Sequence, residues 1–173
     1  MSAITMRAVA EEAGSSLGLA YRYFPTKDDL LGAVLDRAAG FITEGLNPEE
    51  PLTLLAERAW RRMDERPVFA RLFTWLVLER RDITQVMTGH PFLEVAAQRA
   101  AQAGDPNPRT TAAAVGAVVM GGGQFAPAIN HAAGLAPGDQ AVYSRLLAAV
   151  EAMEPSNAAD RQQDAREPGD GVD

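Results

Sequence analysis

The sequence predicts an all-α fold, and three observations support this prediction. Apolar residues recur at helical spacing along nearly the whole chain, and no stretch alternates between apolar and polar residues as a half-buried strand would. Capping residues, glycines and prolines divide the chain into segments of helical length. A content of 47% hydrophobic and 23% charged residues is typical of a soluble globular protein. With 173 residues, the chain can form one core or a small head joined to a larger body.

The first two predicted helices are short and closely spaced. Thr5 is the expected N-cap of a helix over residues 5–13, and Gly14 ends this helix because glycine adopts a left-handed backbone at little cost. Ser16 then caps a second helix over residues 17–24. This order of helix, tight turn and short helix is typical of a geometry that presents one exposed helix to a partner.

The third predicted helix begins at a strong local signal. Pro25 stops the helix before it, because a residue that precedes proline disfavours helical angles. Thr26 caps the next helix, and Asp29 three residues later completes the pattern of a capping box. An apolar stripe then follows along this helix, formed by Leu30, Leu31, Val34, Leu35, Ala38 and Ile42.

A larger helical body is predicted after this head. The segment "NPEEP" at residues 47–51 separates the two parts, and the helical pattern fades again at "ERRDITQVMTG", residues 79–89. The segments "GDPNP" at 104–108 and "GLAPGD" at 134–139 are predicted turns. Helices are therefore expected over residues 51–65, from residue 67 to the start of the fading segment, and over residues 91–103, 109–133 and 140–153.

The net charge of −7 argues at first sight against a nucleic-acid partner, because phosphate binding needs local positive charge. Residues 154–173, however, contain six acidic residues and two arginines, and so carry −4 of this charge. Their composition, with almost no large apolar residue, predicts a disordered acidic tail. The remaining net charge of −3 leaves DNA binding open.

The run "TMRAVAEEAGSSLGLAYRYFPTKDDLL" at residues 5–31 resembles the helix-turn-helix signature of the TetR family of bacterial transcriptional regulators. The resemblance covers about residues 3–46. Beyond it the likeness is architectural, with "GQFAPAINHAAGL" at 123–135 similar to later helices of the family's regulatory domain. The residues that carry the match are Thr5, Arg7, Ala10, Ala13, Gly14, Ser16, Gly18, Tyr21, Arg22, Tyr23, Phe24, Lys27, Leu30 and Leu31.

The resemblance implies a helix-turn-helix head at 1–46 and a multi-helix ligand-binding and dimerisation bundle at 47–153, which the acidic tail at 154–173 follows. It implies a homodimer whose two heads bind half-sites of a near-palindromic double-stranded DNA operator, with the second helix of the motif in the major groove. No apolar run approaches the roughly 18 residues needed to span a bilayer, so we expect a cytoplasmic protein. A small-molecule effector bound by the body would release the operator by favouring one of two states. The expected function is that of a ligand-responsive repressor, with no cofactor and no membrane partner.

Candidate DNA contacts follow from the motif and from the chemistry of the side chains. The guanidinium fork of Arg22 can pair with guanine, while the hydroxyls of Tyr21 and Tyr23 and the ammonium of Lys27 can bind phosphates. These side chains could instead be solvated or packing residues. The full set of predicted DNA-binding residues is Thr5, Arg7, Ser16, Leu17, Gly18, Leu19, Tyr21, Arg22, Tyr23 and Lys27.

The family normally has a helix of about four turns before this motif, whereas only "MSAI" precedes Thr5 here. Without such a helix, Val9, Ala20 and Phe24 are expected to lose their cover, which would weaken the head. We favour a start codon placed too far downstream as the explanation of the short N-terminus. An alternative function is therefore a TetR-like helical ligand-binding dimer that has lost operator binding.

Apolar and aromatic residues of the body supply candidates for a ligand pocket, although each could simply belong to the core. They are Trp60, Met63, Phe73, Trp75, Met87, Phe92 and Phe125. Enzymatic activity and metal binding have little support. The chain has no cysteine, and its two histidines, His90 and His131, have no carboxylate or histidine partner at metal-binding spacing. We therefore expect no catalytic residue and no metal ligand.

Overall fold

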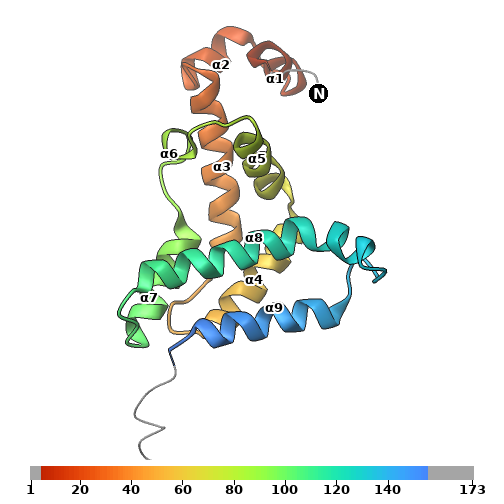
Figure 1. The fold of residues 1–173 in the computed structure, drawn as a ribbon. Coiled ribbons are helices and arrows are strands. Elements are labelled where there is room, and N and C mark those ends of the chain that lie inside the picture. The colour runs from red at the N-terminus through yellow and green to blue at the C-terminus, as the bar shows by residue number, and fades with distance from the viewer. Residues whose placement is uncertain (1–4, 156–173) are drawn as a thin grey trace, which may run out of the picture.

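The computed structural model describes residues 5–155, and this part of the chain consists of α-helices and connecting segments without a strand, as predicted (Figure 1). The predicted tail lies outside the described residues from residue 156 onward. The helices are α1 (Met6–Glu12), α2 (Leu17–Tyr23), α3 (Lys27–Thr43), α4 (Leu52–Glu65), α5 (Val68–Leu78), α6 (Ile83–Val86), α7 (Pro91–Gln102), α8 (Pro108–Ala132) and α9 (Gln140–Met153).

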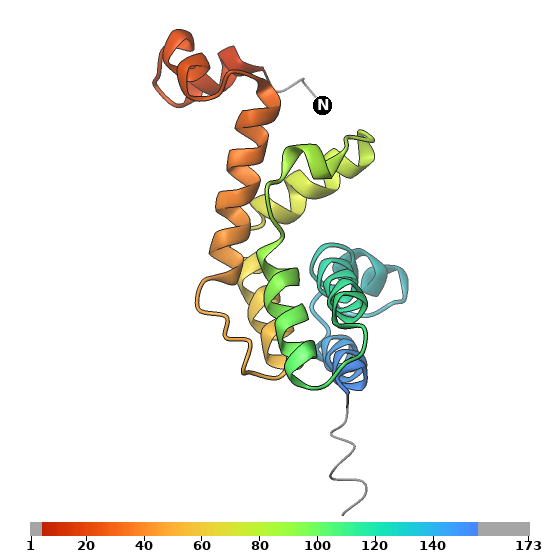
Figure 2. The same ribbon diagram turned by 90° about the vertical axis from the view of Figure 1, so that its left-hand side faces the viewer.

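Helix α3 connects the two ends of the molecule (Figures 1 and 2). The short helices α1 and α2 lie at its N-terminal end and pack chiefly on each other. Helices α4, α7, α8 and α9 form a bundle near its C-terminal end. Helices α5 and α6 lie along α3 between these two groups, so that they contact the same helix that carries the head.

The N-terminal capping signals are confirmed. The Thr5 hydroxyl accepts the Ala8 amide hydrogen at 3.2 Å, and the Ser16 hydroxyl accepts that of Leu19 at 3.1 Å. Thr26 and Asp29 form the predicted capping box. These bonds satisfy amide groups that would otherwise lack a partner in the first turn of each helix, and they explain why the helix starts could be predicted from local sequence.

The predicted break over residues 79–89 contains a short helix, α6, that the sequence pattern did not indicate. Asp82 caps it, because its carboxylate accepts the amide hydrogen of Thr84 at 3.0 Å. Hydrogen bonds from Thr84 lower the pKa of Asp82. With four residues, α6 is too short to show a helical period.

The core of the body lies between α4, α7, α8 and α9, around Trp60. The indole Nε1 of Trp60 donates to the Val119 carbonyl of α8 at 2.6 Å, and its ring meets Tyr143 of α9 edge to face at 5.7 Å. Gly122 and Gly123 of α8 face Trp60 and Met63 of α4 at close range. These two glycines therefore let α8 pack closely against α4.

Helix α8 is long and apolar enough to cross a membrane by length and composition, so the prediction that no apolar run approaches this length was wrong. It is the one such helix in the part of the chain that the structure describes. Its buried positions, among them Ala112, Val115 and Val119, face α4, α7 and α9. Through these positions one face of α8 packs into the core of the body.

Glu154 joins the end of α9 to two other helices. Its carboxylate accepts the amide hydrogen of Leu52, the first residue of α4, at 3.2 Å and forms an ion pair with Arg99 of α7. The carboxylate is largely buried. The first residue of the predicted tail is therefore part of the folded body.

Replacing Glu154 with glutamine is expected to lower the free energy of unfolding by about 1–2 kcal/mol, because Arg99 would lose its counter-ion in a partly buried place. Denaturant unfolding followed by circular dichroism measures this change. Glu151→Gln is the matched control, since this exposed residue of the same helix makes no ion pair within residues 5–155. Equal stability of the two variants would show that the Glu154 contacts contribute nothing.

Candidate DNA-binding surface and ligand cavity

None of the residues of helix α2 is buried, and all except Leu17 and Ala20 are exposed. Leu19, Tyr21 and Tyr23 have exposed fractions of 41%, 48% and 65%, which is unusual for such large side chains. The Arg22 guanidinium lies over the Tyr23 ring, 5.6 Å from its centroid. Because α2 stands at the far end of the molecule from α8 and α9 (Figure 1), this surface is open to a large partner.

The other predicted DNA-binding residues border the same helix. Arg7 and Gly18 are exposed, and Leu17 is half-buried. Thr5 and Ser16 are exposed N-caps whose hydroxyl oxygens accept backbone N–H groups, so that each hydroxyl can still donate its own hydrogen to a phosphate oxygen. The first two helices therefore bring together nine of the ten predicted residues, all except Lys27.

Lys27, the tenth residue, begins α3 and contacts α5. Its ammonium lies 5.5 Å from the centroid of the Trp75 ring. The next residue, Asp28, forms an ion pair at 3.0 Å with Arg81, which lies between α5 and α6. The N-terminus of α3 therefore contacts α5 and the segment that follows it. Trp75 lies at this contact, under the ammonium of Lys27.

An apolar hollow of about 320 Å³ lies between α1, α2 and the start of α3. Val9, Ala20 and Phe24, the residues expected to lose their cover, all line it. Phe24 and Ala20 do face the interior of the head, as predicted, but both are only half-buried. In α1 and α2 only Met6 and Ala10 are buried, so the described head has a very small core of its own.

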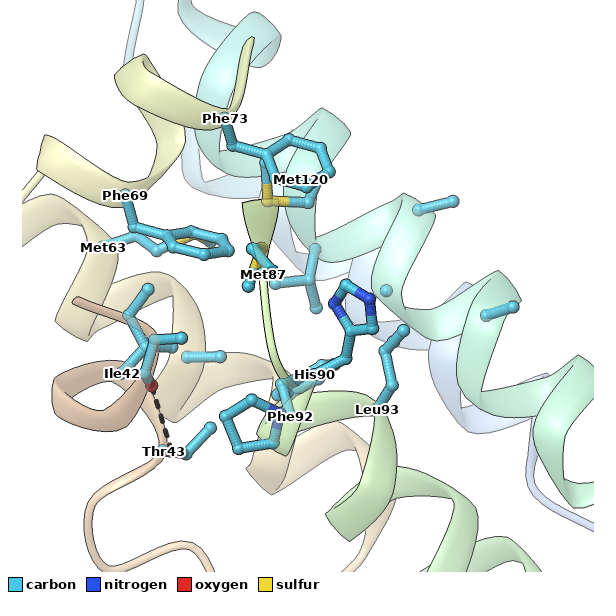
Figure 3. A pocket seen from close by; sticks show the side chains of 17 residues that line it. Ile42, Thr43, Met63, Phe69, Phe73, Met87, His90, Phe92, Leu93 and Met120 are labelled. Atoms are coloured by element: carbon cyan, nitrogen blue, oxygen red, sulfur yellow. Dashed lines mark hydrogen bonds between the residues drawn. The ribbon is translucent and has the colours of Figure 1, made fainter. Parts of the chain in front are cut away.

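An apolar cavity of about 350 Å³ lies where α3, α4, α5, α7 and α8 meet (Figure 3). Volumes of this size are typical of small-molecule sites. The lining residues are Ala39, Ile42, Thr43, Ala59, Met63, Phe69, Phe73, Met87, His90, Pro91, Phe92, Leu93, Ala113, Gly116, Ala117, Val119 and Met120.

Four predicted pocket residues, namely Met63, Phe73, Met87 and Phe92, line this cavity. The other three lie elsewhere: Trp60 is in the core of the body, Trp75 lies beneath Lys27, and Phe125 is 49% exposed. Helical spacing identifies an apolar face but does not show what the face packs against, which is why these three could not be separated from the four.

Sequence reasoning did not select His90, Phe69 and Met120 as lining residues. His90 is the N-cap residue of α7, a position that follows from Pro91 at the first turn of that helix. This signal gives the start of α7 but not the direction of the imidazole, which extends into the cavity (Figure 3).

The segment from Arg81 to Thr88 packs along α3 and also forms part of the cavity wall. Two polar contacts flank it, the Arg81–Asp28 ion pair and a 2.7 Å hydrogen bond from the Thr88 hydroxyl to Asp36. Between them Val86 and Met87 pack against Leu31, Leu35 and Ala39 of α3. Met87 belongs both to this cluster and to the cavity lining, so the cavity and α3 share a wall.

One of these contacts depends on a glycine. An ideal Cβ built at Gly32 of α3 would overlap with the Val86 carbonyl oxygen. The backbone of the α6 segment can approach α3 this closely only because position 32 has no side chain. We call the contacts of residues 81–88 with α3 the α3 clamp.

Comparisons with known proteins agree with the geometry of the head. Residues 1–34 match the model of the bacterial regulatory proteins of the tetR family. The HTH-type transcriptional repressor KstR of Rhodococcus jostii (strain RHA1) is 37% identical over 78 residues, which are 42% of this chain and 37% of that repressor. The chain thus matches little more than a third of this relative, and no solved structure matches. The segment that contains the capped α1 and the exposed α2 is therefore similar to the bacterial regulatory proteins of the tetR family.

Proposed function

We propose that this protein is a DNA-binding transcriptional repressor whose operator binding responds to a small molecule. The observation that carries the proposal is the exposed helix α2, which bears Arg22 and two tyrosines within a segment that matches the TetR family. A capped helix of this kind presents its side chains to base edges and phosphates of the major groove. The similarity to a transcriptional repressor favours repression over activation.

The outer faces of α8 and α9 support a homodimer, which would present two heads to a near-palindromic operator. Phe125 and Ile129 of α8 are large apolar residues with exposed fractions of 49% and 63%. The exposed positions of α9 include Ala148, Ala149 and Ala152. Small residues beside large apolar ones allow the helices of a second copy to pack closely, and such packing would bury this apolar surface.

The cavity and the α3 clamp support control by a ligand. A molecule that fills the cavity contacts Met87, and Met87 packs against the helix that carries the head. Such a ligand changes operator affinity if it binds one arrangement of α3 more tightly than the other. No catalytic group is required for this function.

The test of DNA binding uses fluorescence anisotropy with DNA that flanks the gene. Arg22→Ala is expected to weaken binding about tenfold, because a base contact of this kind contributes about 1–3 kcal/mol. Lys27→Ala is expected to weaken binding and to reduce the salt slope by about 1, because one phosphate contact is lost. Arg109→Ala is the matched control, since this exposed arginine begins α8, away from the head.

Several outcomes would contradict this proposal. If Arg22→Ala and Lys27→Ala bind as the unaltered chain does, the exposed face of α2 is not the DNA-binding surface. If the unaltered chain binds a ligand in the cavity but no DNA, the protein is the helical ligand-binding dimer without operator binding. Turnover of a substrate that depends on a buried polar residue would instead indicate an enzyme.

A further inference from the structure

We propose that the cavity binds a mainly hydrocarbon molecule with one uncharged oxygen group, a hydroxyl or a carbonyl, that forms a hydrogen bond with His90. This inference rests on the proposed ligand binding and names the chemical class of the ligand. It follows from the charge of the lining, from the hydrogen bonds of its two polar residues and from the side chains around them.

The cavity lining contains no formally charged aspartate, glutamate, lysine or arginine side chain. A ligand with a permanent charge would find no counter-ion in this lining when it moves from water into the cavity. The desolvation of such an unpaired charge is very unfavourable. A neutral ligand avoids this cost. The lining therefore selects against carboxylates, phosphates and ammonium groups.

Thr43 and His90 are the two lining residues that bear polar side-chain groups. The Thr43 hydroxyl donates its hydrogen to the Ala39 carbonyl at 3.0 Å, within its own helix. The His90 imidazole, in contrast, makes no hydrogen bond to any residue in the range 5–155, and only its backbone carbonyl is used, by the Glu94 amide at 3.1 Å. The Thr43 hydroxyl has thus used its donor and can only accept from a ligand, whereas the His90 imidazole can both donate and accept.

A neutral imidazole offers one N–H donor and one nitrogen acceptor. A ligand hydroxyl can use either of them, and a ligand carbonyl can accept from the N–H group. In Figure 3 the ring projects among apolar side chains, and Met87 and Leu93 line the same space. One hydrogen bond from an uncharged oxygen would thus satisfy the imidazole and orient the ligand.

The rest of the lining suits hydrocarbon. Phe69 and Phe73 stack with their centroids 5.7 Å apart at one wall, and Met63, Met87 and Met120 surround the space near them. Methionine side chains are flexible and polarizable, so they adapt to apolar ligands of different shape. The cavity is therefore expected to discriminate among ligands by the polar group that they place at His90 more than by their overall shape.

The experiment uses the full chain and three probes of one shape: naphthalene, 2-naphthol and 2-naphthoate. Each probe competes with N-phenyl-1-naphthylamine, an uncharged dye that fluoresces in apolar sites. We expect 2-naphthol to bind best and 2-naphthoate worst. His90→Phe should weaken 2-naphthol about five- to tenfold and leave naphthalene unchanged, because only the hydrogen bond is lost. His90→Gln, which keeps a donor and an acceptor, should restore part of the 2-naphthol affinity.

Ala117→Trp shows where the dye binds. Ala117 is an exposed lining residue of α8, so a large side chain there fills the cavity from its open side without entering the core. We expect this variant to lose dye binding while its circular dichroism spectrum is kept. If dye binding persists, the cavity is not the ligand site, and the ligand part of the proposed function fails with this inference.

Other results would overturn the ligand class alone. If 2-naphthoate competes best, if no probe competes, or if His90→Phe weakens all three probes equally, His90 does not select an uncharged oxygen. DNA binding is measured separately by anisotropy, so its loss or persistence does not affect this conclusion.

Discussion

Gly32→Ala is expected to lower the free energy of unfolding by about 3 kcal/mol, at the upper end of typical overpacking costs. The added Cβ would meet the Val86 carbonyl oxygen, which is backbone and cannot rotate away. The α6 segment must therefore move from α3, which would weaken the α3 clamp and the packing of Val86 and Met87 against Leu31 and Leu35. Denaturant unfolding gives the change in stability.

Gly40→Ala is the matched control for this prediction. Gly40 lies in the same helix, and a Cβ there would meet nothing within 4 Å. Alanine is expected to stabilise α3 at this position by up to about 1 kcal/mol, through its higher helix propensity. If both variants have the same stability, the close contact of position 32 with α6 does not exist as described.

The same pair of variants tests the link between cavity and head. If the α3 clamp transmits ligand binding, Gly32→Ala should reduce the effect of a cavity ligand on DNA affinity, while Gly40→Ala should preserve it. Anisotropy titrations with and without 2-naphthol measure the ratio of the two affinities. An unchanged ratio in Gly32→Ala would mean that coupling does not pass through this contact.

Gly122→Ala is expected to cost about 2 kcal/mol of unfolding free energy, again by overpacking. A Cβ at this position would lie 2.8 Å from Cζ2 of Trp60 and 3.0 Å from Cδ1 of Leu146. The Trp60 ring is held by its hydrogen bond to Val119 and cannot turn aside without losing it. The effect should also appear as a change in tryptophan fluorescence.

Gly121→Ala serves as the control, because a Cβ at the adjacent position would meet nothing within 4 Å. It should stabilise the helix of the isolated chain by up to about 1 kcal/mol. Both variants are measured at several protein concentrations, since a dimer contact at position 121 would make stability depend on concentration. Equal destabilisation of both variants would contradict the predicted difference between these neighbouring positions.

The local features of the fold could be predicted because local interactions determine them. Each cap at Thr5, Ser16 and Thr26 is a hydrogen bond between a side chain and an amide three residues later. Both partners can therefore be identified from the local sequence. Proline and glycine likewise mark helix boundaries by their own backbone preferences. Helix α6 was missed because its existence depends on packing against α3 rather than on a period.

The site could be predicted only where a local motif accompanies it. The motif fixes the order of α1 and α2, so the candidate DNA contacts form one surface, although their contacts with DNA remain predictions. The pairing of Lys27 with Trp75 joins residues that are far apart in the sequence, and no local pattern indicates it. The direction of His90 into the cavity depends in the same way on how α7 packs against α3 and α8.

The length of helix α3 would amplify a small tilt at its cavity end. Its 17 residues span about 26 Å, since each residue of an α-helix rises about 1.5 Å. A tilt of about 5° at the cavity end would displace the other end by roughly 2 Å, which is more than half of the 3.4 Å rise between base pairs. In a dimer, the same displacement in both copies would change the distance between the two heads by twice this amount. Under the proposed function, a small change in the volume of the cavity would therefore be enough to misalign the heads with the operator while every helix stays folded.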